Sequence, residues 1–320
     1  AINDFTPEEY WIISVELIKD EGKKKILFNA RLTGSKRYSG EDAKLIEQDL
    51  PLCDFRVDSV SNKTSKVKPQ APFTTSTLQQ EASRRLSGFS VSRTMRIAQQ
   101  LYEGIALGSG AETGLITYMR TDSTVMSATA TTEINEFIRS HYGEQYLGTG
   151  SRRRGRKSAV AAQEAHEAIR PTSINRTPEE VARYLTREQI ALYTLIWRRA
   201  LASRMADTLN KVTTVHISAE KTGTIVYRLS SSGSEPEFDG YMRIYNVGNN
   251  KSEESVDDED SSDEQEDFQK IPKLIKGEEL VLNKVNNDQK FTRPAPRYSQ
   301  ASFVRTLEES GIGRPSTYAS

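Results

Sequence analysis

The chain has 320 residues, of which 44 are basic and 44 acidic, so its formal net charge is +0, and 36% of its residues are apolar. At about 100–200 residues per domain, this length predicts two or three domains, each large enough to bury a core. No apolar run approaches the length that spans a bilayer, and the N-terminus lacks a signal-peptide pattern, so we expect a cytoplasmic protein. The single cysteine, Cys53, excludes an internal disulfide and a cysteine-based zinc site.

The first predicted element is a β-hairpin. Apolar side chains alternate over residues 11–17 and again over 26–32, and the turn is supplied by Asp-Glu-Gly at 20–22. We expect Trp11 to lie in the core of this β region. Strand patterns return only much later, at residues 213–217, 224–229 and 279–285.

Between the two groups of strands the hydrophobic period is that of helices. Residues 76–86 open with hydroxyl caps and carry two glutamines at capping-box spacing. Thr177, followed by proline and two glutamates, is a stronger helix start, and Thr186 begins a further capping box. Apolar residues after Thr186, including Trp197, recur at helical spacing, so we expect Trp197 in the core rather than stacked on a ligand.

Strands on both sides of a helical middle predict a multidomain fold with α and β parts. The β-rich domain is discontinuous, formed by residues 1–77 and 207–291, and a helical domain of residues 78–206 is inserted into it. This arrangement describes a β-rich arch that carries an all-α lobe.

The neutral net charge hides two strongly charged segments. Residues 253–267 contain ten acids and no bases, and residues 152–157 contain five bases in a Gly/Ser-rich stretch. Taken alone, each run is more often a solvated loop than a site. The acidic run is too polar to bury, so we expect a disordered loop of the β domain near 250–268.

One short segment concentrates residues suited to phosphate chemistry. Residues 114–123 read GLITYMRTDS, which places Tyr118, Arg120 and Asp122 within five residues. A lone tyrosine is usually structural, and a phenol with a pKa near 10 needs cationic neighbours or a base to act as a nucleophile. The Arg120 guanidinium suits a phosphate at the same site, and Asp122 is placed to orient it.

A second candidate pair is His166 and Arg170 in the string EAHEAIR. The two residues are four apart and share one face if the segment is helical. Arg170 stands where the zinc motif H-E-x-x-H needs its second histidine, so the pattern favours an anion site over a zinc site. In isolation, an ordinary surface pair explains the same pattern.

Taken together, four blocks in this order resemble the type IA DNA topoisomerases, and most closely the bacterial topoisomerase I branch. They are APFTTSTLQQEA at 71–82, GLITYMRTDS at 114–123, HEAIRPT from His166, and GIGRPSTYA from Gly311. The resemblance is dense over residues 69–208 and 292–320 and diffuse across the β segments.

The resemblance implies an ATP-independent enzyme that breaks and rejoins one DNA strand and so relaxes negatively supercoiled DNA. Tyr118 would attack a phosphodiester, become joined to the 5′ phosphate, and release a 3′ hydroxyl that later reverses the attack. Arg120 would stabilise charge on the phosphoryl oxygens, and His166 would hold or protonate a phosphate oxygen. Arg170 would contact the neighbouring DNA backbone. No nucleotide-binding motif occurs in the sequence.

Further DNA-binding residues are implied by the same resemblance. Residues 292–320 correspond to the start of a helical DNA-binding domain that the chain truncates, in which Arg314, Ser316 and Thr317 grip phosphates. Asp122 belongs to this group, and Glu112, which precedes the tyrosine, helps to shape the pocket.

The family also implies parts that lie outside this chain. The nucleophile faces a Toprim domain whose acids bind Mg²⁺, and no acidic cluster in this sequence fits that role, so we expect a fragment without the Toprim domain and the C-terminal modules. The fragment is expected to bind no metal itself and to bind single-stranded DNA without relaxing DNA. We also expect the protein to be a monomer in the bacterial cytoplasm that is associated with the nucleoid. Neither a membrane nor a nucleotide is expected as a partner.

Alternative functions remain at this point. The first is a noncatalytic module that binds single-stranded DNA. The second is a tyrosine recombinase or type IB enzyme, which links tyrosine to the 3′ phosphate; the block order speaks against it. Within the type IA family, a topoisomerase III-like decatenase and a reverse gyrase are further alternatives.

Overall fold

The computed structural model describes residues 4–22, 24–34, 37–108, 111–148, 167–245 and 269–318. The chain divides into two compact units. The first, called here the barrel unit, comprises residues 1–66, 209–238 and 251–296; the second, the helical unit, comprises 67–208, 239–250 and 297–320. The helical unit thus includes residues 67–77 and 297–318, which the sequence analysis assigned to the β-rich domain and to a third domain. That three-domain division stays a prediction.

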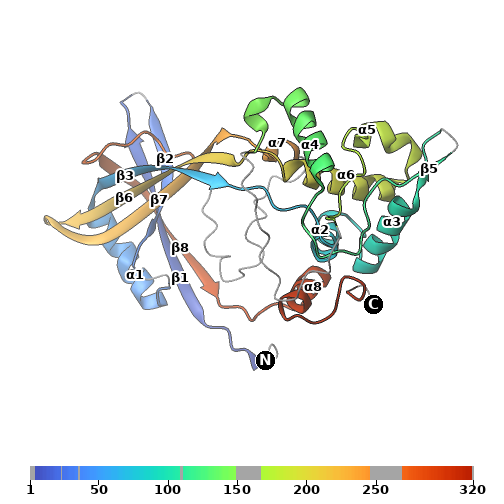
Figure 1. The fold of residues 1–320 in the computed structure, drawn as a ribbon. Coiled ribbons are helices and arrows are strands. Elements are labelled where there is room, and N and C mark those ends of the chain that lie inside the picture. The colour runs from blue at the N-terminus through green and yellow to red at the C-terminus, as the bar shows by residue number, and fades with distance from the viewer. Residues whose placement is uncertain are drawn as a thin grey trace. The chain divides into compact units, whose positions relative to one another are not determined.

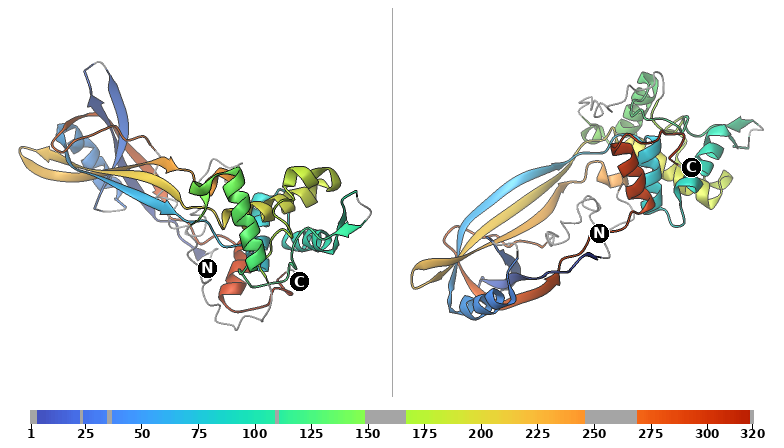
Figure 2. Two further views of the ribbon diagram at one scale, coloured as in Figure 1. Left: turned by 45° about the horizontal axis from the view of Figure 1, so that its top comes forward. Right: turned by 90° about the horizontal axis from the view of Figure 1, so that it is seen from below.

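The barrel unit contains a closed barrel of six strands in the order β1-β2-β7-β6-β3-β8 (Figures 1 and 2). The strands are β1 (Glu9–Asp20), β2 (Lys25–Leu32), β3 (Asp54–Val67), β6 (Thr208–Lys221), β7 (Thr224–Phe238) and β8 (Glu279–Phe291). Every neighbouring pair with a described register is antiparallel. The predicted hairpin is confirmed as β1–β2, and at its turn the Gly22 N–H donates to the Asp20 carboxylate over 2.7 Å.

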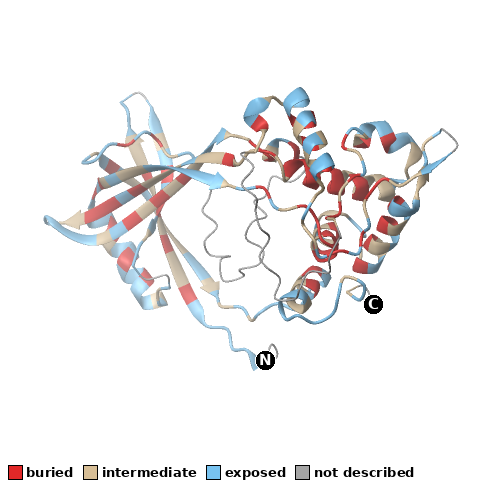
Figure 3. Ribbon diagram, viewed as in Figure 1, coloured by how far each residue is buried: buried red, intermediate tan, exposed pale blue. Residues whose placement is uncertain are grey.

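Alternation along the strands builds the core of the barrel unit (Figure 3). The buried residues stand two apart: Ile13, Val15 and Leu17 in β1, Phe28 and Ala30 in β2, and Val215, Ile217 and Ala219 in β6. Helix α1 (Gly40–Asp49) and the short 3₁₀ turn η2 (Leu50–Leu52) add Ala43, Ile46 and Leu50 to the same core. Trp11 is half-buried and packs against this cluster, so it borders the predicted core rather than lying within it.

The helical unit is built mainly from short helices around α6. Its elements are α2 (Thr75–Arg85), α3 (Val91–Glu103), β4 (Ile105–Ala106), β5 (Glu112–Thr113), α4 (Ala128–His141), η3 (Glu144–Tyr146), α5 (Pro178–Val181), η4 (Ala182–Tyr184), α6 (Arg187–Ala202), α7 (Met242–Tyr245) and α8 (Gln300–Glu309). Trp197 is 6% exposed and its indole N–H donates to the Ile174 carbonyl over 2.8 Å, which confirms its core position. Among the described helices, none is long and apolar enough to cross a bilayer.

Helix starts in this unit follow the predicted capping chemistry, with one correction. Capping boxes are present at Thr177 and Thr186, as the sequence predicts. In α2 the cap is Thr74, and its capping-box partner is Thr77. The glutamines Gln79 and Gln80, which the sequence analysis placed in that role, are buried instead. The helix begins early enough that both glutamines fall on its packed side.

Candidate active site

Tyr118 lies in the irregular segment between β5 and α4 of the helical unit. Burial alternates along this segment: Met119 and Thr121 are 1% and 2% exposed, whereas the Tyr118 side chain is 40% exposed and Arg120 and Asp122 are exposed. The structure therefore leaves all three predicted residues accessible to solvent within one short segment.

Two other sequence blocks contact this segment, so that three of the four blocks meet here. Isolated β-bridges join Phe73 to Ile169 and Ile116 to Pro171. The Thr117 N–H donates to the Arg170 carbonyl over 3.0 Å, and the Thr75 N–H donates to the Thr121 carbonyl over 2.9 Å. Residues 71–75, 114–121 and 167–172 thus form an irregular layer that carries Tyr118, although they are far apart in the sequence.

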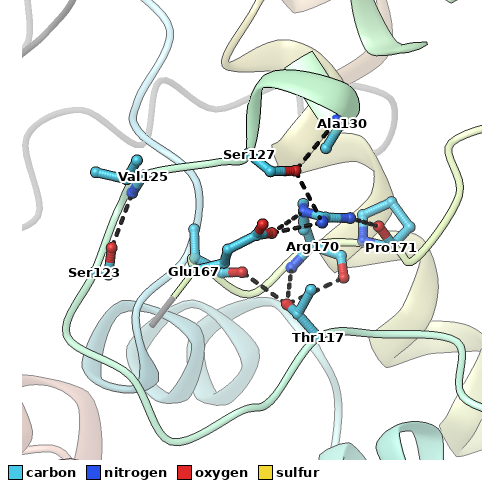
Figure 4. Close-up of polar contacts among 9 residues, drawn as sticks. Thr117, Ser123, Val125, Ser127, Ala130, Glu167, Arg170 and Pro171 are labelled. Atoms are coloured by element: carbon cyan, nitrogen blue, oxygen red, sulfur yellow. Dashed lines mark hydrogen bonds and ion pairs between the residues drawn. The ribbon is translucent and has the colours of Figure 1, made fainter. Parts of the chain in front are cut away.

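The surroundings of Arg170 differ from the expectation (Figure 4). Its guanidinium donates from Nε to Glu167 over 2.6 Å, from Nη1 to the Pro171 carbonyl over 2.9 Å, and from Nη2 to the Ser127 hydroxyl over 3.5 Å. Only 12% of the Arg170 side chain is exposed. Protein acceptors therefore occupy much of the planar fork, and a contact between Arg170 and DNA stays a prediction.

The helical premise behind the pair His166 and Arg170 is wrong for the described part of that segment. Residues 167–171 contain no helix, because their main chain bonds to residues 73 and 115–117 instead of to itself. His166, the acidic run at 253–267 and the basic run at 152–157 lie outside the described residues.

A second tyrosine, which the sequence analysis did not single out, contacts the nucleophile candidate. The rings of Tyr102 and Tyr118 meet edge to face, with centroids 5.4 Å apart and an interplanar angle of 66°. Tyr102 stands at the end of α3 and is 40% exposed. The pair forms a small aromatic surface, and no local signal at Tyr102 distinguishes it from an ordinary helix residue.

The predicted residues near the C-terminus lie in a turn that follows α8. The Arg314 N–H donates to the Thr317 hydroxyl over 2.9 Å, and the Thr317 N–H donates back to the Arg314 carbonyl over 2.8 Å. Arg314, Ser316 and Thr317 are all exposed. Binding of DNA by this turn stays a prediction.

The same turn is tied to the blocks that carry Tyr118. The Ser76 hydroxyl in α2 donates to the Glu308 carboxylate in α8 over 2.6 Å. Burial raises the pKa of the Tyr318 phenol, and the negative charges of Glu308 and Asp122 raise it further. The bond between Ser76 and Glu308 thus fastens α8, the helix that leads into the fourth sequence block, to the helix that begins in the first block.

Glu112 is exposed in β5 and pairs through its main chain with Ala106 in β4. No hydrogen bond or ion pair of its carboxylate to another described residue supports a role in shaping the pocket, so that role stays a prediction. Over the described ranges, no three His, Cys, Asp or Glu side chains gather in a way that could hold a metal ion.

Comparison with known proteins finds relatives over the whole chain. The family described as DNA topoisomerase matches residues 1–320. DNA topoisomerase 1 of Rickettsia felis is 42% identical over 328 aligned residues, which cover 100% of this chain and 40% of that protein. DNA topoisomerase 1 of Rickettsia prowazekii gives the same identity and coverage.

A solved structure supports the same relationship. The full-length topoisomerase I from Thermotoga maritima superposes with a TM-score of 0.76 at 35% identity, over 99% of this chain and 46% of that one. The chain thus spans about 40% of the length of the curated relatives that it matches. The resemblance carried by the four sequence blocks is confirmed, and the chain belongs to the bacterial type IA DNA topoisomerase I family.

Proposed function

We propose that this chain is the strand-cleaving part of a DNA topoisomerase that relaxes negatively supercoiled DNA, with Tyr118 as the nucleophile. The barrel unit would serve as a β-rich arch, and the inserted helices would form the nucleophile domain. The observation that carries the proposal is the exposure of Tyr118, Arg120 and Asp122 within five residues of one another, on a segment that two other sequence blocks hold in place.

The proposed reaction exchanges one phosphodiester for another. The Tyr118 oxygen gives up its proton and attacks phosphorus, the bond from phosphorus to the 3′ oxygen breaks, and that oxygen leaves as a hydroxyl after gaining a proton. The product is a 5′-phosphotyrosine ester, which the 3′ hydroxyl attacks in the reverse step after another strand has passed. One ester is made for each ester broken, so no nucleotide hydrolysis is needed.

Arg120 is suited to stabilise the phosphoryl oxygens in this step. It is exposed beside the nucleophile, and no hydrogen bond or ion pair joins its guanidinium to another described residue. A free planar fork can bind a phosphate through two donors and stabilise the charge that develops there. His166 keeps its proposed role as a donor to a phosphate oxygen.

DNA, mainly single-stranded, is the proposed partner of the exposed turn after α8. The hydroxyls of Ser316 and Thr317 and the charge of Arg314 are groups that commonly contact phosphates. A binding site of this type depends on released counterions, so its affinity falls as salt is added. A monomer that works at the nucleoid in the bacterial cytoplasm is part of the same proposal.

Magnesium belongs to the proposal only through the full-length protein. The described residues do not offer a suitable group of ligands, and the resemblance assigns the metal to a separate domain. No step derived from this chain is therefore routed through Mg²⁺. We expect the 320-residue chain alone to bind single-stranded DNA and to leave supercoiled plasmid unrelaxed.

The test uses the full-length protein and two copies of one single-stranded oligonucleotide, one labelled at its 5′ end and the other at its 3′ end. A 5′-phosphotyrosine retains the part of the strand that ends at the 3′ label, so only that label should travel with denatured protein. Tyr118→Phe keeps the ring but removes the attacking oxygen, and no adduct should form while binding persists. Tyr102→Phe is the matched control, because it removes the hydroxyl of the neighbouring ring.

Each other outcome selects an alternative. Transfer of the 5′ label would identify a 3′-phosphate linkage, as in type IB enzymes and tyrosine recombinases. Binding without any adduct would identify a noncatalytic single-strand-binding module. An adduct that survives in Tyr118→Phe would place the nucleophile elsewhere.

A further inference from the structure

The hydroxyl groups of two threonines, the buried Thr75 and the half-buried Thr117, fasten the main chain on either side of Tyr118. Thr75 is 0% exposed, and its Oγ1 donates to the Met119 carbonyl over 2.7 Å and accepts from the Thr121 N–H over 2.8 Å. A hydroxyl can donate and accept at once, which these two bonds use. Thr75 therefore holds the two peptide groups that flank Arg120, one residue beyond the nucleophile.

The position of Thr75 at the start of a helix adds a main-chain hydrogen bond to the contacts of its side chain. Thr75 is the first residue of α2, where backbone N–H groups have no acceptor within the helix. Thr74 caps the helix by accepting from Thr77, and the Thr75 N–H donates to the Thr121 carbonyl over 2.9 Å. The helix end and the Tyr118 segment thus complete each other's hydrogen bonding.

Thr117 makes the corresponding contact on the other side of the nucleophile. Its Oγ1 donates to the Ala168 carbonyl over 2.7 Å and accepts from the Arg170 N–H over 3.0 Å (Figure 4). Its own N–H donates to the Arg170 carbonyl. Residue 117 is therefore fixed to the segment 168–170 by side chain and main chain together.

We propose that Thr75 and Thr117 are positioning residues for the cleavage reaction, which hold the Tyr118 oxygen where it can attack in line with the leaving 3′ oxygen. The inference rests on the proposed function of Tyr118. Neither hydroxyl touches the DNA in this scheme; each acts through the main chain of the nucleophile segment. The Tyr118 side chain is 40% exposed and its ring meets Tyr102 edge to face, so the fixed main chain sets the point from which this side chain leaves the segment.

Valine and serine variants of the two threonines distinguish a positioning role from a general contribution to stability. Valine has the shape of threonine without the oxygen, so Thr75→Val leaves the Met119 carbonyl and the Thr121 N–H without that partner. The segment then shifts to find other partners, and a misplacement of about 1 Å can slow a reaction on the order of a hundredfold. Serine keeps the oxygen and should keep most of the rate.

The experiment measures single-turnover adduct formation on labelled single-stranded DNA by the full-length protein. Thr75→Val and Thr117→Val should slow cleavage at saturating DNA by at least roughly tenfold, with the Kd for DNA unchanged within about threefold. Thr75→Ser and Thr117→Ser should recover the rate to within about threefold of the unaltered protein, since the hydroxyl contacts return.

Thr94→Val is the matched control. Thr94 is also 0% exposed in the helical unit, and its hydroxyl donates to the Ser90 carbonyl over 2.8 Å within α3, away from the nucleophile segment. We expect cleavage by Thr94→Val to be unchanged; its melting temperature should fall less than that of Thr75→Val, because the Ser90 carbonyl keeps the Thr94 N–H as a donor. Should Thr75→Val not fold, Thr117→Val and the two serine variants carry the same comparison.

The outcomes keep this inference apart from the proposed function. If the unaltered protein forms no adduct, or Tyr118→Phe still forms one, the proposed function fails. If the unaltered protein forms the adduct but both valine variants cleave as fast as Thr94→Val, the positioning role alone is wrong. It is equally wrong if the serine variants stay as slow as the valine variants at equal stability.

Discussion

The two units of this chain bury different kinds of side chain. In the barrel unit the core is almost wholly apolar and is set by alternation along the strands. The helical unit buries many polar groups as well, including Thr74, Thr75, Ser76, Gln79, Gln80, Thr94, Thr121, Thr208 and Arg199. Irregular segments have no ladder of their own, so buried side chains must satisfy their main-chain groups. The unit that carries the site therefore combines an apolar core with specific buried polar contacts, whereas the core of the barrel unit is almost wholly apolar.

The two tryptophans allow each unit to be followed separately. Trp11 belongs to the barrel unit and Trp197 to the helical unit, and the chain has no other tryptophan. In Trp197→Phe the only remaining tryptophan is Trp11 of the barrel unit, and in Trp11→Phe it is Trp197 of the helical unit. Urea unfolding followed by tryptophan fluorescence in these two variants therefore reports on each unit separately.

The largest effect is expected for Arg199→Ala. Arg199 is 4% exposed, donates to the Ala71 carbonyl and the Tyr245 hydroxyl over 2.7 and 2.8 Å, and lies over the Phe73 ring. Its loss removes two hydrogen bonds from a charged donor, at roughly 1.5–3 kcal/mol each, and the contact with the Phe73 ring, so the free energy of unfolding of the helical unit should fall by about 4 kcal/mol. A loss below about 1 kcal/mol would remove the contrast between the units.

Leu17→Ala is the corresponding change in the barrel unit. Leu17 is 0% exposed in β1, and truncation of a buried leucine costs about 3 kcal/mol through lost burial and the cavity left behind. The Trp11 signal should report this loss. Leu27→Ala in β2, where leucine is 51% exposed, is the control and should stay within about 0.5 kcal/mol. Equal losses for the two leucines would contradict the described core.

Asp49 gives the barrel unit a pH-dependent polar contact. Hydrogen bonds from Lys221 and then from the Tyr227 hydroxyl hold the pKa of this carboxyl below its ordinary value. A depressed folded pKa contributes stability that is present above the unfolded value and is lost as pH falls through the folded one. Barrel stability should therefore decline in acid, and Asp49→Asn should flatten that decline. An unchanged acid slope in the variant would show that other carboxyls cause it.

The smallest effect is expected at an exposed ion pair of the barrel unit. Arg56 and Glu279 approach to 3.1 Å, and their side chains are 51% and 82% exposed. Exposed pairs contribute about 0–1 kcal/mol and are screened by salt, so Arg56→Ala should barely change urea unfolding. If this variant destabilised the barrel as much as Leu17→Ala, surface charges rather than the apolar core would hold the barrel together.

Sequence patterns predicted elements in which apolar residues recur regularly, and they missed elements in which only a few residues are buried. The hairpin of β1 and β2 follows a regular alternation, and the structure contains it. Strand β3 was not predicted, because only Phe55 and Val57 are buried and the rest of this strand is polar apart from Val60 and Val67. Helix α1 buries only Ala43 and Ile46, which is too short a stripe to show a helical period.

The candidate site shows the same limit at the level of single residues. Tyr118, Arg120 and Asp122 could be found from their types and spacing, and the structure leaves all three exposed. The hydroxyl contacts of Thr75 and Thr117 could not, because a threonine at a helix start looks like any cap and its partners are distant in sequence. Arg170 was assigned to DNA from its charge, whereas its acceptors come from segments that only the tertiary structure brings together.

The closed barrel has a consequence for how the chain is made. Strand β1 pairs with β8 from Glu9–Phe291 to Ile18–Val281. One edge of β1 therefore has no partner strand until nearly the whole chain has been synthesised. At about 5–20 residues per second, the ribosome needs on the order of tens of seconds to deliver β8 after β1. During that time the open edge can pair with other strands, including those of neighbouring nascent chains. The helical unit has most of its residues before β8 is made, so its folding precedes closure of the barrel.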